Sequence, residues 1–435
     1  MSMNMDGQRV YVMGLGRFGG GVGVIRYLVG QGAEVVVGDV GDAGGLADSI
    51  AQLQDLIDAK KVRLALGEHE VVDLNGAKML VVNPAVLRPW ESSFVDEARS
   101  KGIEITTEIE IAYRLLDPTK LIAVTGSAGK STTCGMIHHG LNDLGHDVVL
   151  GGNIGGSLLG ELKSIDRGAI VVLELSSAML YWLGESGVLD DSPPRVGCVT
   201  NCVPNHLDWH GDAGHYEDSK RVLARCAEHQ ILGEDVAHWG DGVVVIDGVR
   251  GCVAPGKHNG VNAAMAVECV LAMVNEDRNR VVEAVRGFGG LAHRLQLVHE
   301  GDGVRFYNDS KCTVPGATVL AVEAISETVS RSRIHLIVGG YDKGSDLSAI
   351  SKMGPELGGL YGIGVTGGGI GASASGDVFD CGDLDRAMEM IGERVVDGDA
   401  VVLSPGCASW DQFVNYEERG DRFAELARSM RGEQV

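Results

Sequence analysis

Short apolar runs separated by longer stretches of mixed polarity recur along the whole chain. Such runs lie at residues 9–13, 34–38, 79–82 and 121–125, and they lead into glycine or polar residues. A continuous apolar run bounded by turn residues is typical of a strand buried on both faces, whereas the stretches between the runs read as helices. The pattern therefore predicts an α/β protein with mostly parallel sheets.

A glycine-rich turn lies near the start of the chain in a strand–turn–helix setting. The strand at 9–13 leads into GLGRFG at 14–19, a helix runs through about residue 30, and the next strand ends at Asp39. Glycines allow close approach of the backbone to a phosphate, and an acid about 20 residues further on can bond a ribose. With further strands at 79–82 and 102–106, we expect a Rossmann-like domain that binds a diphosphate-type ligand.

A second glycine-rich loop follows the strand at 121–125, with the sequence GSAGKSTT at 126–133. Glycines let N–H groups converge on an anion, Lys130 can reach outer phosphates, and a hydroxyl can bind Mg²⁺, so a phosphate cradle is predicted. Only two residues separate Gly126 from Gly129, fewer than in the standard P-loop. A plain turn with an exposed lysine is the alternative.

One carboxylate interrupts the apolar run at 169–175. Glu174 stands near the end of this predicted strand, and Ser176 and Ser177 follow it. A buried carboxylate is costly unless it pairs or binds a metal, and ligands of open α/β sheets bind beyond strand ends of this kind. The alternatives are a buried ion pair for Glu174 and a capping role for the serines.

Histidines and a lysine stand out in the segment 201–221. His206, Asp208 and His210 alternate on what we expect to be an irregular loop, and this spacing favours zinc only weakly because no cysteine or helical histidine pair completes a standard site. Tyr216 and Lys220 share one face of a predicted helix. By default, Lys220 would be a solvated surface lysine.

The last third of the chain again shows strands that end in polar loops. Strands are predicted at 304–308, 334–338 and 400–403, a helix at 418–430, and a strand with a mobile loop in the glycine-dense segment 362–371. These strands indicate a second Rossmann-like sheet with a site along one edge. The expected domains are residues 1–107, 108–295 and 296–435.

Composition narrows the class of protein. A chain of 435 residues suggests two to four domains, and a net charge of −23 argues against a general nucleic-acid binder. The nine cysteines form no Cys-x-x-Cys pair, which indicates a reducing cytoplasm. We expect no membrane span, because no run of about 18 apolar residues occurs, and no signal peptide.

Taken in order, these stretches resemble the Mur ligases over nearly the whole chain. The resemblance rests on residues 14–16, 125–132, 152–155, 173–177, 205–208, 216–220 and 256–259, and further on 293–294, 308–311, 342–344 and 404–409. The final run NYEERGDRF at 415–423 looks like the glutamate-adding branch in particular. One of these motifs alone is weak evidence, but so many in the same order make the alternative interpretations jointly improbable.

The resemblance implies an ATP-dependent amide-bond-forming ligase of three α/β domains: a Rossmann-like N-terminal domain, a P-loop-type central domain and a Rossmann-like C-terminal domain. In this family, ATP phosphorylates the carboxylate of UDP-N-acetylmuramoyl-L-alanine to an acyl phosphate, which the amine of D-glutamate attacks. The resemblance also implies that the protein uses ATP and binds Mg²⁺ at two sites. It further implies a cytoplasmic role in peptidoglycan precursor synthesis. A monomer without nucleic-acid partners is expected.

The resemblance also assigns roles to residues. Catalytic roles fall to Lys130, His206 and Lys220, the last matching the lysine that this family carbamylates with CO₂. Metal binding falls to Ser131, Glu174, His206 and Lys220. ATP contacts fall to Gly126, Ser127, Gly129, Lys130, Ser131, Thr132, His258, Asn259, Asn262, Arg294, Asp309 and Lys311. Contacts to the UDP substrate fall to Leu15, Gly16, Asp39, Asn83, Asn153, Ser176 and Ser177. Glutamate contacts fall to Lys343, Ser409 and Tyr416.

Five positions depart from the family pattern. Ala128 stands where asparagine is usual, Ala178 and Met179 where an aromatic residue and a glutamine are common, and Val314 where asparagine is frequent. A phenylalanine is replaced by Tyr416. Because the lysines, Glu174 and His206 are retained, we predict an active enzyme.

Other functions remain open from the sequence. A related Mur-type or folylpolyglutamate-type ligase would use another amino acid or L-glutamate. A nucleotide-binding regulator would bind ATP without turnover, and an NAD dehydrogenase would show no dependence on ATP.

Overall fold

The chain forms two compact units, and the computed structural model describes residues 4–16, 20–154, 157–160, 162, 165, 168–341 and 344–430. The first unit comprises Met1–Ile246 with Ala264–Ala284, and the second comprises Asp247–Ala263 with Val285–Val435. Helix α11 (Lys257–Met273) contributes residues to both units. Each unit is built on mostly parallel strands, as the apolar runs predicted.

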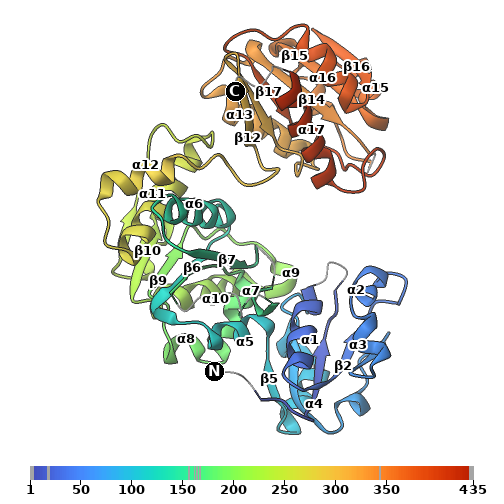
Figure 1. Ribbon diagram of the computed structural model, residues 1–435, viewed down its shortest axis with the longest axis vertical. Coiled ribbons are helices and arrows are strands. Elements are labelled where there is room, and N and C mark those ends of the chain that lie inside the picture. Colours follow the sequence, from blue (N-terminus) through green and yellow to red (C-terminus); the bar gives the residue numbers. More distant parts are fainter. Residues whose placement is uncertain are drawn as a thin grey trace. The chain divides into compact units, whose positions relative to one another are not determined.

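The first sheet lies within the first unit (Figure 1). Its order is β3 (Val62–Leu66), β2 (Glu34–Asp39), β1 (Arg9–Met13), β4 (Ala77–Val82) and β5 (Glu104–Thr106), with all neighbours parallel. Its longer helices are α1 (Gly20–Gly30) and α4 (Ser93–Ser100). The strands predicted at 9–13, 34–38, 79–82 and 102–106 are confirmed, and β3 is an additional one.

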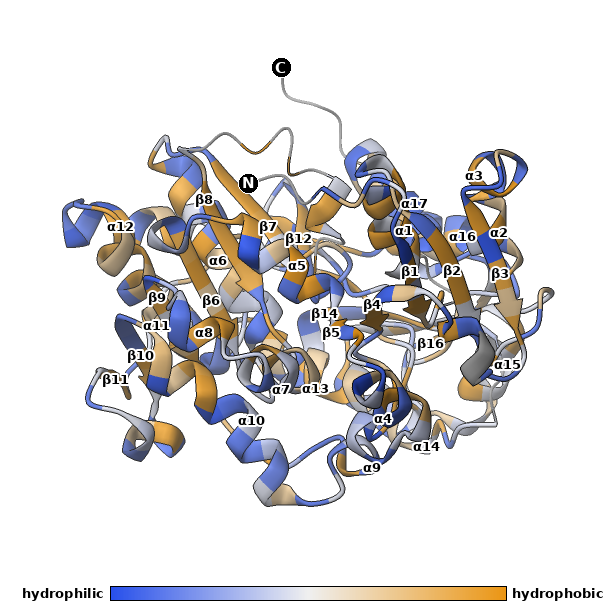
Figure 2. Ribbon diagram, turned by 90° about the horizontal axis from the view of Figure 1, so that it is seen from below, coloured by the Kyte–Doolittle hydropathy of each residue, from blue (hydrophilic) through white to orange (hydrophobic). Residues whose placement is uncertain are grey.

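The central sheet of the first unit has the order β11 (Val243–Val245), β10 (His229–Gly233), β9 (Val196–Val199), β6 (Leu121–Thr125), β8 (Ile170–Glu174) and β7 (Val148–Gly152), again wholly parallel. Helices α6 (Lys130–Asp143) and α10 (Ala213–Cys226) pack on it, and α10 also contacts α7 (Ser177–Glu185). Strands β6 and β8 are buried throughout and hydrophobic along most of their length (Figure 2). Because the strands are parallel, their carboxyl ends share one edge, where ligands of such sheets bind.

A continuous apolar core joins the first and central sheets. It includes Val10 and Val37 of the first sheet, Leu121 and Leu173 of the central sheet, and Ile111 of the connecting helix α5 (Glu108–Leu115). Burial of aliphatic side chains on this scale is the main stabilising contribution to such a unit. The strand ends of both sheets are therefore held in one body.

The third sheet lies in the second unit. Its order is β12 (Gln296–Gly301), β13 (Val304–Asn308), β17 (Ala400–Leu403), β14 (Ile334–Gly339), β15 (Gly359–Ile363) and β16 (Val378–Gly382), and only the β12–β13 pair is antiparallel among these named strands. Separate apolar clusters lie on its two faces, under helices that include α13 (Pro315–Ser326), α16 (Leu384–Gly392) and α17 (Tyr416–Met430). The three strands predicted here are confirmed.

The glycine-dense segment 362–371 does not form a strand with a mobile loop. It ends β15 and then forms helix α15 (Gly364–Ser373). A Cβ on Gly367 would lie 2.7 Å from the carbonyl carbon of Gly362, so the glycines allow the helix to lie directly against the strand. The prediction was wrong because these glycines serve close packing rather than a turn.

The remaining helices are short or lie at the periphery. They are α2 (Ala47–Ala51), α3 (Gln54–Asp58), α8 (Val188–Asp191), α9 (Leu207–His210), α12 (Arg278–Arg286) and α14 (Ser348–Ser351). In the described ranges, no helix has both the length and the apolar character needed to cross a membrane.

Candidate functional site

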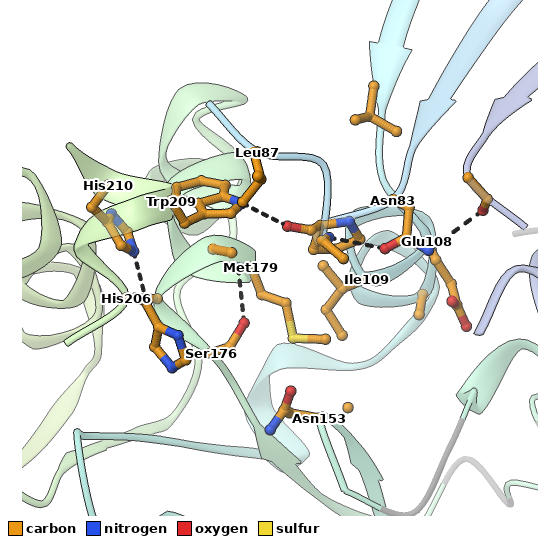
Figure 3. Close-up of a pocket in the computed structure, with 18 of the residues that line it drawn as sticks. Asn83, Leu87, Glu108, Ile109, Asn153, Ser176, Met179, His206, Trp209 and His210 are labelled. Atoms are coloured by element: carbon orange, nitrogen blue, oxygen red, sulfur yellow. Dashed lines mark hydrogen bonds between the residues drawn. The ribbon is translucent and has the colours of Figure 1, made fainter. Parts of the chain in front are cut away.

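A pocket of about 710 Å³ opens at the strand ends of the first unit. Its lining comes from both sheets of that unit and includes Asn83 from the first sheet, and Lys130, Asn153, His206 and Lys220 from the central one. Figure 3 shows Asn83, Asn153, Ser176, His206 and Trp209 around this space. The pocket therefore brings together residues that the sequence assigned to phosphate, metal and sugar-nucleotide binding.

The loop after β6 has the geometry of an anion site at a helix N-terminus. Gly126 (φ 149°) and Gly129 (φ 81°) both adopt backbone conformations that favour glycine, and Gly129 is the N-cap of α6. A Cβ on Gly126 would lie only 1.8 Å from Thr200 Oγ1, so no larger residue fits. Ser131 and Thr132 lie in the first turn of α6, where free N–H groups and the helix dipole favour an anion.

Two lysines converge on this loop. Lys130 Nζ donates to the carbonyls of Gly126 (2.9 Å) and Ser127 (3.2 Å), and Lys220 Nζ donates to Gly126 O (2.9 Å) and Thr125 Oγ1 (3.2 Å). The interpretation of the loop as a plain turn with an exposed lysine does not fit this arrangement. Two ammonium groups on one carbonyl create a local cationic centre in a strongly acidic protein.

Lys220 is almost completely buried, with 1% of its surface exposed. Its ammonium group lies 4.9 Å from the centre of the Tyr216 ring, which confirms that the two side chains share one helix face. Burial and, next, the nearby Lys130 lower the pKa of Lys220 from 10.5 to about 7. The default expectation of a solvated lysine was wrong, because α10 turns this side chain into the pocket.

Glu174 ends β8 with 1% of its surface exposed. Asn153 Nδ2 donates to its Oε1 at 2.7 Å, and Asn153 N donates to its backbone carbonyl at 2.8 Å. The carboxylate is therefore held by an amide and not by the buried ion pair that was the alternative. Within the described part of the chain, Oε2 has no hydrogen-bond partner, and such a buried oxygen fits a cation.

His206 is exposed on the rim of the pocket and has a left-handed backbone (φ 51°). The segment is irregular at residues 201–206, as expected, but Leu207–His210 form the short helix α9, whose turn is closed by a hydrogen bond from His210 N to His206 O at 2.9 Å. His206 and Asp208 are exposed, whereas His210 is buried against Ser177. No group of three His, Cys, Asp or Glu side chains among the described residues is arranged to hold a metal ion.

In the first sheet, an internal carboxylate caps the glycine-rich turn. Asp39 Oδ2 accepts hydrogen bonds from the N–H groups of Leu15 (2.8 Å) and Gly16 (3.0 Å). Asn83 packs beside this turn, and its Nδ2 donates to Gly14 O at 3.4 Å. The predicted sugar-nucleotide residues of this sheet are thus brought together around amides that can bind an anion.

The two serines after Glu174 differ in their roles. Ser176 is the N-cap of α7, and its Oγ accepts from Met179 N at 3.2 Å, so the capping interpretation holds for this residue. Ser177 Oγ lies 2.8 Å from His210 Nε2. Both serines line the pocket.

The second unit holds the remaining residues expected to contact ATP. At the start of α11, Asn259 Nδ2 donates to Pro255 O (2.6 Å) and Asn262 Nδ2 donates to Asn259 Oδ1 (3.2 Å). These bonds hold both asparagine side chains at the start of the helix, and His258 lies in the same first turn.

A second group of expected ATP residues follows β12 and β13. Leu295 N and Ser404 Oγ both donate to the carboxylate of Asp309, at 3.0 and 2.7 Å. Burial raises the pKa of Asp309 to about 6. Arg294 is exposed nearby, and Lys311 Nζ lies 5.2 Å from the centre of the Tyr416 ring.

Two of the three residues expected to bind glutamate lie in the described part of the chain. Ser409 is buried, Tyr416 begins α17, and Lys343 lies outside the described residues. Ser310 Oγ donates to Tyr416 O at 2.8 Å, so the loop after β13 is tied to the start of α17. Tyr341 N donates to Ala408 O at 2.9 Å and joins the loops after β14 and β17.

Sequence reasoning missed Arg419, which fastens these loops. Its exposed fraction is 1%, and its guanidinium donates to Ser310 Oγ (2.9 Å), Ser310 O (2.8 Å), Cys407 O (3.1 Å) and Ala408 O (3.3 Å). Burial lowers the pKa of Arg419 to about 10. The sequence shows this arginine inside the final run NYEERGDRF, but arginines of an amphipathic helix ordinarily lie on its exposed face, so its burial was not predicted.

Sequence reasoning also missed Trp209, which links the loop of His206 to the first sheet. Its Nε1 donates to Pro84 O at 3.0 Å, as Figure 3 shows. Trp90, Tyr181 and His215 pack around it, with ring centres 5.1 to 6.3 Å from that of Trp209. The aromatic residues were visible in the sequence, but nothing in their spacing indicated that they meet.

Comparison with known proteins agrees with this geometry. Residues 124–233 match the family described as Mur ligase middle domain. The UDP-N-acetylmuramoylalanine–D-glutamate ligase of Caldanaerobacter subterraneus is 32% identical over 99% of this chain and 100% of its own, and that of Pelotomaculum thermopropionicum is 34% identical over 98% of each.

Solved structures show the same fold at lower identity. The UDP-N-acetylmuramate–alanine ligase of Thermotoga maritima aligns with a TM-score of 0.55 and 18% identity over 96% of this chain and 98% of its own. A MurF ligase from the same organism, in complex with ADP, aligns with a TM-score of 0.51 and 16% identity over 97% of this chain and 95% of its own. With near-complete coverage and more than 30% identity to its curated relatives, the chain belongs to the UDP-N-acetylmuramoylalanine–D-glutamate ligase family of the Mur ligases.

Proposed function

We propose that this protein is an ATP-dependent ligase that joins D-glutamate to UDP-N-acetylmuramoyl-L-alanine through an acyl phosphate. One observation carries the proposal: Lys130 and Lys220 meet on the carbonyl of Gly126, in the same pocket as the half-satisfied carboxylate of Glu174. Phosphoryl transfer between anions needs cations and a metal-binding carboxylate placed together. Family membership supplies the substrates that fit this chemistry.

The chain's residues divide the work of the reaction. The loop at Gly126–Thr132 and Lys130 hold the ATP phosphates, so that the carboxylate of the sugar nucleotide attacks the γ-phosphorus and ADP leaves. The sugar nucleotide is held by the Leu15–Gly16 turn, Asn83, Asn153 and Ser177. The amine of D-glutamate, held by Lys343, Ser409 and Tyr416, then attacks the acyl carbon, and phosphate leaves from a tetrahedral intermediate. His258, Asn259, Asn262, Arg294, Asp309 and Lys311 complete the contacts to ATP.

Mg²⁺ fits the donors around Glu174. Oε2 of Glu174 is a buried oxygen without a partner in the described chain, and Ser131 supplies a hydroxyl of the kind that binds Mg²⁺ in phosphate loops. The metal would neutralise phosphate charge when bound. His206 and a carbamate on Lys220 would add donors for a second ion. A lysine with a pKa of about 7 has the neutral amine that reaction with CO₂ requires.

The setting follows from the substrates. A sugar-nucleotide precursor of peptidoglycan is made in the cytoplasm, and the cysteines, all free where described, suit a reducing compartment. We propose a cytoplasmic monomer.

Product formation tests the proposal directly. Purified protein with ATP, Mg²⁺, UDP-N-acetylmuramoyl-L-alanine and D-glutamate should release phosphate and yield a product whose mass is the sum of both substrates less one water. A panel containing L-glutamate and diamino acids separates this function from that of related ligases. Binding of ATP without phosphate release would refute the enzyme and favour a regulator.

The role of Lys220 is tested by chemical rescue. Lys220→Ala should lose turnover, and added short carboxylic acids should restore part of it by standing in for the carbamate. A variant that keeps full turnover would remove Lys220 from the mechanism.

A further inference from the structure

A hydrogen-bonded chain of three side chains leads from the half-buried His215 through the buried His210 to Ser177 at the pocket. His215 Nδ1 lies 2.8 Å from His210 Nδ1, and His210 Nε2 lies 2.8 Å from Ser177 Oγ. His210 has 2% and Ser177 5% of its surface exposed, so water has little access to the bond between them, whereas His215 is half-buried. Both residues nevertheless line the pocket.

The proton count of this chain fixes its two possible states. In its neutral form the His210 ring carries one proton, either on Nδ1 or on Nε2, and each nitrogen has a hydrogen-bond partner. If that proton is on Nδ1, Ser177 must donate its hydroxyl hydrogen to Nε2 and can only accept from a ligand. If it is on Nε2, His210 donates to Ser177 Oγ, and the hydroxyl hydrogen is available to the pocket.

An anionic ligand selects between these states, because an anion needs a donor. We propose that His210 is a positioning residue that donates through Nε2 to Ser177 and thereby turns the Ser177 hydroxyl into a hydrogen-bond donor for an anionic group of the sugar nucleotide. His215 completes the state by donating from its Nδ1 to His210 Nδ1. This inference rests on the proposed function, which supplies the identity of the anion.

The far end of the chain is held firmly enough to maintain this state. The N–H of His215 donates to Asp212 Oδ1 at 2.9 Å at the start of α10. Its ring packs against Trp90 and Tyr181, with ring centres 4.3 and 5.3 Å away. On the other side, the ring centre of His210 lies 4.5 Å from that of Trp209 and 5.2 Å from that of Tyr216, and the His210 and Tyr216 rings are perpendicular. Fixed rings keep both nitrogens of His210 aligned with their partners.

A double-mutant cycle tests the inference. Ser177→Ala should raise KM for UDP-N-acetylmuramoyl-L-alanine about tenfold, because a hydrogen bond to a charged group is worth about that factor or more. His210→Phe removes the donor that fixes the direction of the Ser177 hydroxyl, and it should raise the same KM severalfold. The double variant should lose no more than Ser177→Ala alone, since His210 acts only through this hydroxyl. KM for ATP and for D-glutamate should stay within about twofold.

Two further variants separate positioning from structural support. His210→Gln offers an amide N–H near the place of Nε2 and should recover most of the affinity. His335→Phe is the matched control: His335 is also buried, and it bonds Tyr361 Oη (3.0 Å) and Asp399 (3.4 Å) in the second unit. Its replacement should cost stability without changing KM for the sugar nucleotide.

The outcomes are distinct. Losses that add in the double variant, or a glutamine variant as weak as the phenylalanine one, would overturn the inference. If the wild-type protein forms no product, the proposed function fails. Calorimetric affinities of the four proteins in the cycle for UDP-N-acetylmuramoyl-L-alanine then decide the inference alone.

Discussion

At the scale of the residue, Lys220 shows how burial changes the chemistry of a side chain. Helix α10 places its ammonium group beside that of Lys130 and out of contact with water. Both conditions disfavour the charged form, which is why its pKa falls to about 7. The folded protein therefore pays for keeping this lysine protonated, whereas the unfolded chain does not.

This cost leads us to predict how the stability of the protein depends on pH. Between about pH 7 and 10 the unfolded chain binds more protons at Lys220 than the folded protein, so this residue makes stability rise with pH across the window. Lys220→Met removes the effect. The unfolding free energy of the Lys220→Met variant should exceed that of the wild type by the largest amount below pH 7. The difference should shrink as the pH approaches 10.

Denaturant unfolding in CO₂-free buffer at several pH values measures this difference, and effects of other groups cancel between the two proteins. A difference that stays constant from pH 6 to 10 would mean that Lys220 titrates normally in the folded protein.

At the scale of the element, helix α17 acts through one side chain. Arg419 satisfies three backbone carbonyls and one hydroxyl, and these belong to the loops that follow β13 and β17. Those loops carry Lys311 and Ser409, which are expected to contact the acyl phosphate and glutamate. The helix therefore holds two loops in one register without lying in the site itself.

Replacing Arg419 with Met should loosen both loops. Buried acceptors without donors cost about 1–3 kcal/mol each, so the unfolding free energy of the second unit should fall by several kcal/mol. KM for D-glutamate should rise more than KM for the sugar nucleotide. Calorimetric unfolding and steady-state kinetics measure the two effects.

The same helix offers a matched control. Arg422 is exposed and pairs with Asp385 and Glu425, so Arg422→Met should cost at most about 1 kcal/mol. Equal losses in both variants would mean that the buried contacts of Arg419 carry no special weight.

Predictability also differs between elements. Strands such as β6, β8 and β14 are apolar along their length because both faces are buried, and they were found from the sequence. The strands β3, β11, β12 and β16 lie at sheet edges and carry exposed or polar residues, so their patterns are weak. The glycine helix α15 was missed because glycine usually indicates a turn.

The functional site likewise has a part that could be predicted from the sequence and a part that could not. Motifs along the chain identified Lys130 and Glu174 as candidates, since one follows a strand and the other ends one, and the family resemblance identified His206. What no motif contained was the meeting of Lys220 with Gly126 O, or of His210 with Ser177. These contacts join segments far apart in the sequence and depend on the order of strands and the direction of helices. Burial of Arg419 was hidden for the same reason.

At the scale of the whole molecule, the net charge of −23 opposes the approach of anionic substrates. Lys130 in the phosphate loop forms a local cationic centre, which attracts them only at short range. Screening acts over about 30 Å at 0.01 M salt and about 10 Å at 0.1 M, so added salt weakens the long-range repulsion before the local attraction.

We therefore expect kcat/KM for UDP-N-acetylmuramoyl-L-alanine to rise severalfold as NaCl increases from about 0.01 to 0.1 M at constant free Mg²⁺. The rise should be smaller for D-glutamate, which carries less negative charge and so serves as an internal control. A fall with salt would show instead that the local centre governs the encounter.

The carboxylate of Asp39 on the amides of Leu15 and Gly16 has a consequence for measured affinities. The turn is already satisfied by an anion of the protein's own, so a nucleotide that binds there must evict it. Binding is then an exchange of partners, and its free energy reports how much better a phosphate serves those amides than Asp39 does. A nucleoside without phosphate cannot replace Asp39 on these amides, so the turn selects for ligands that carry a phosphate.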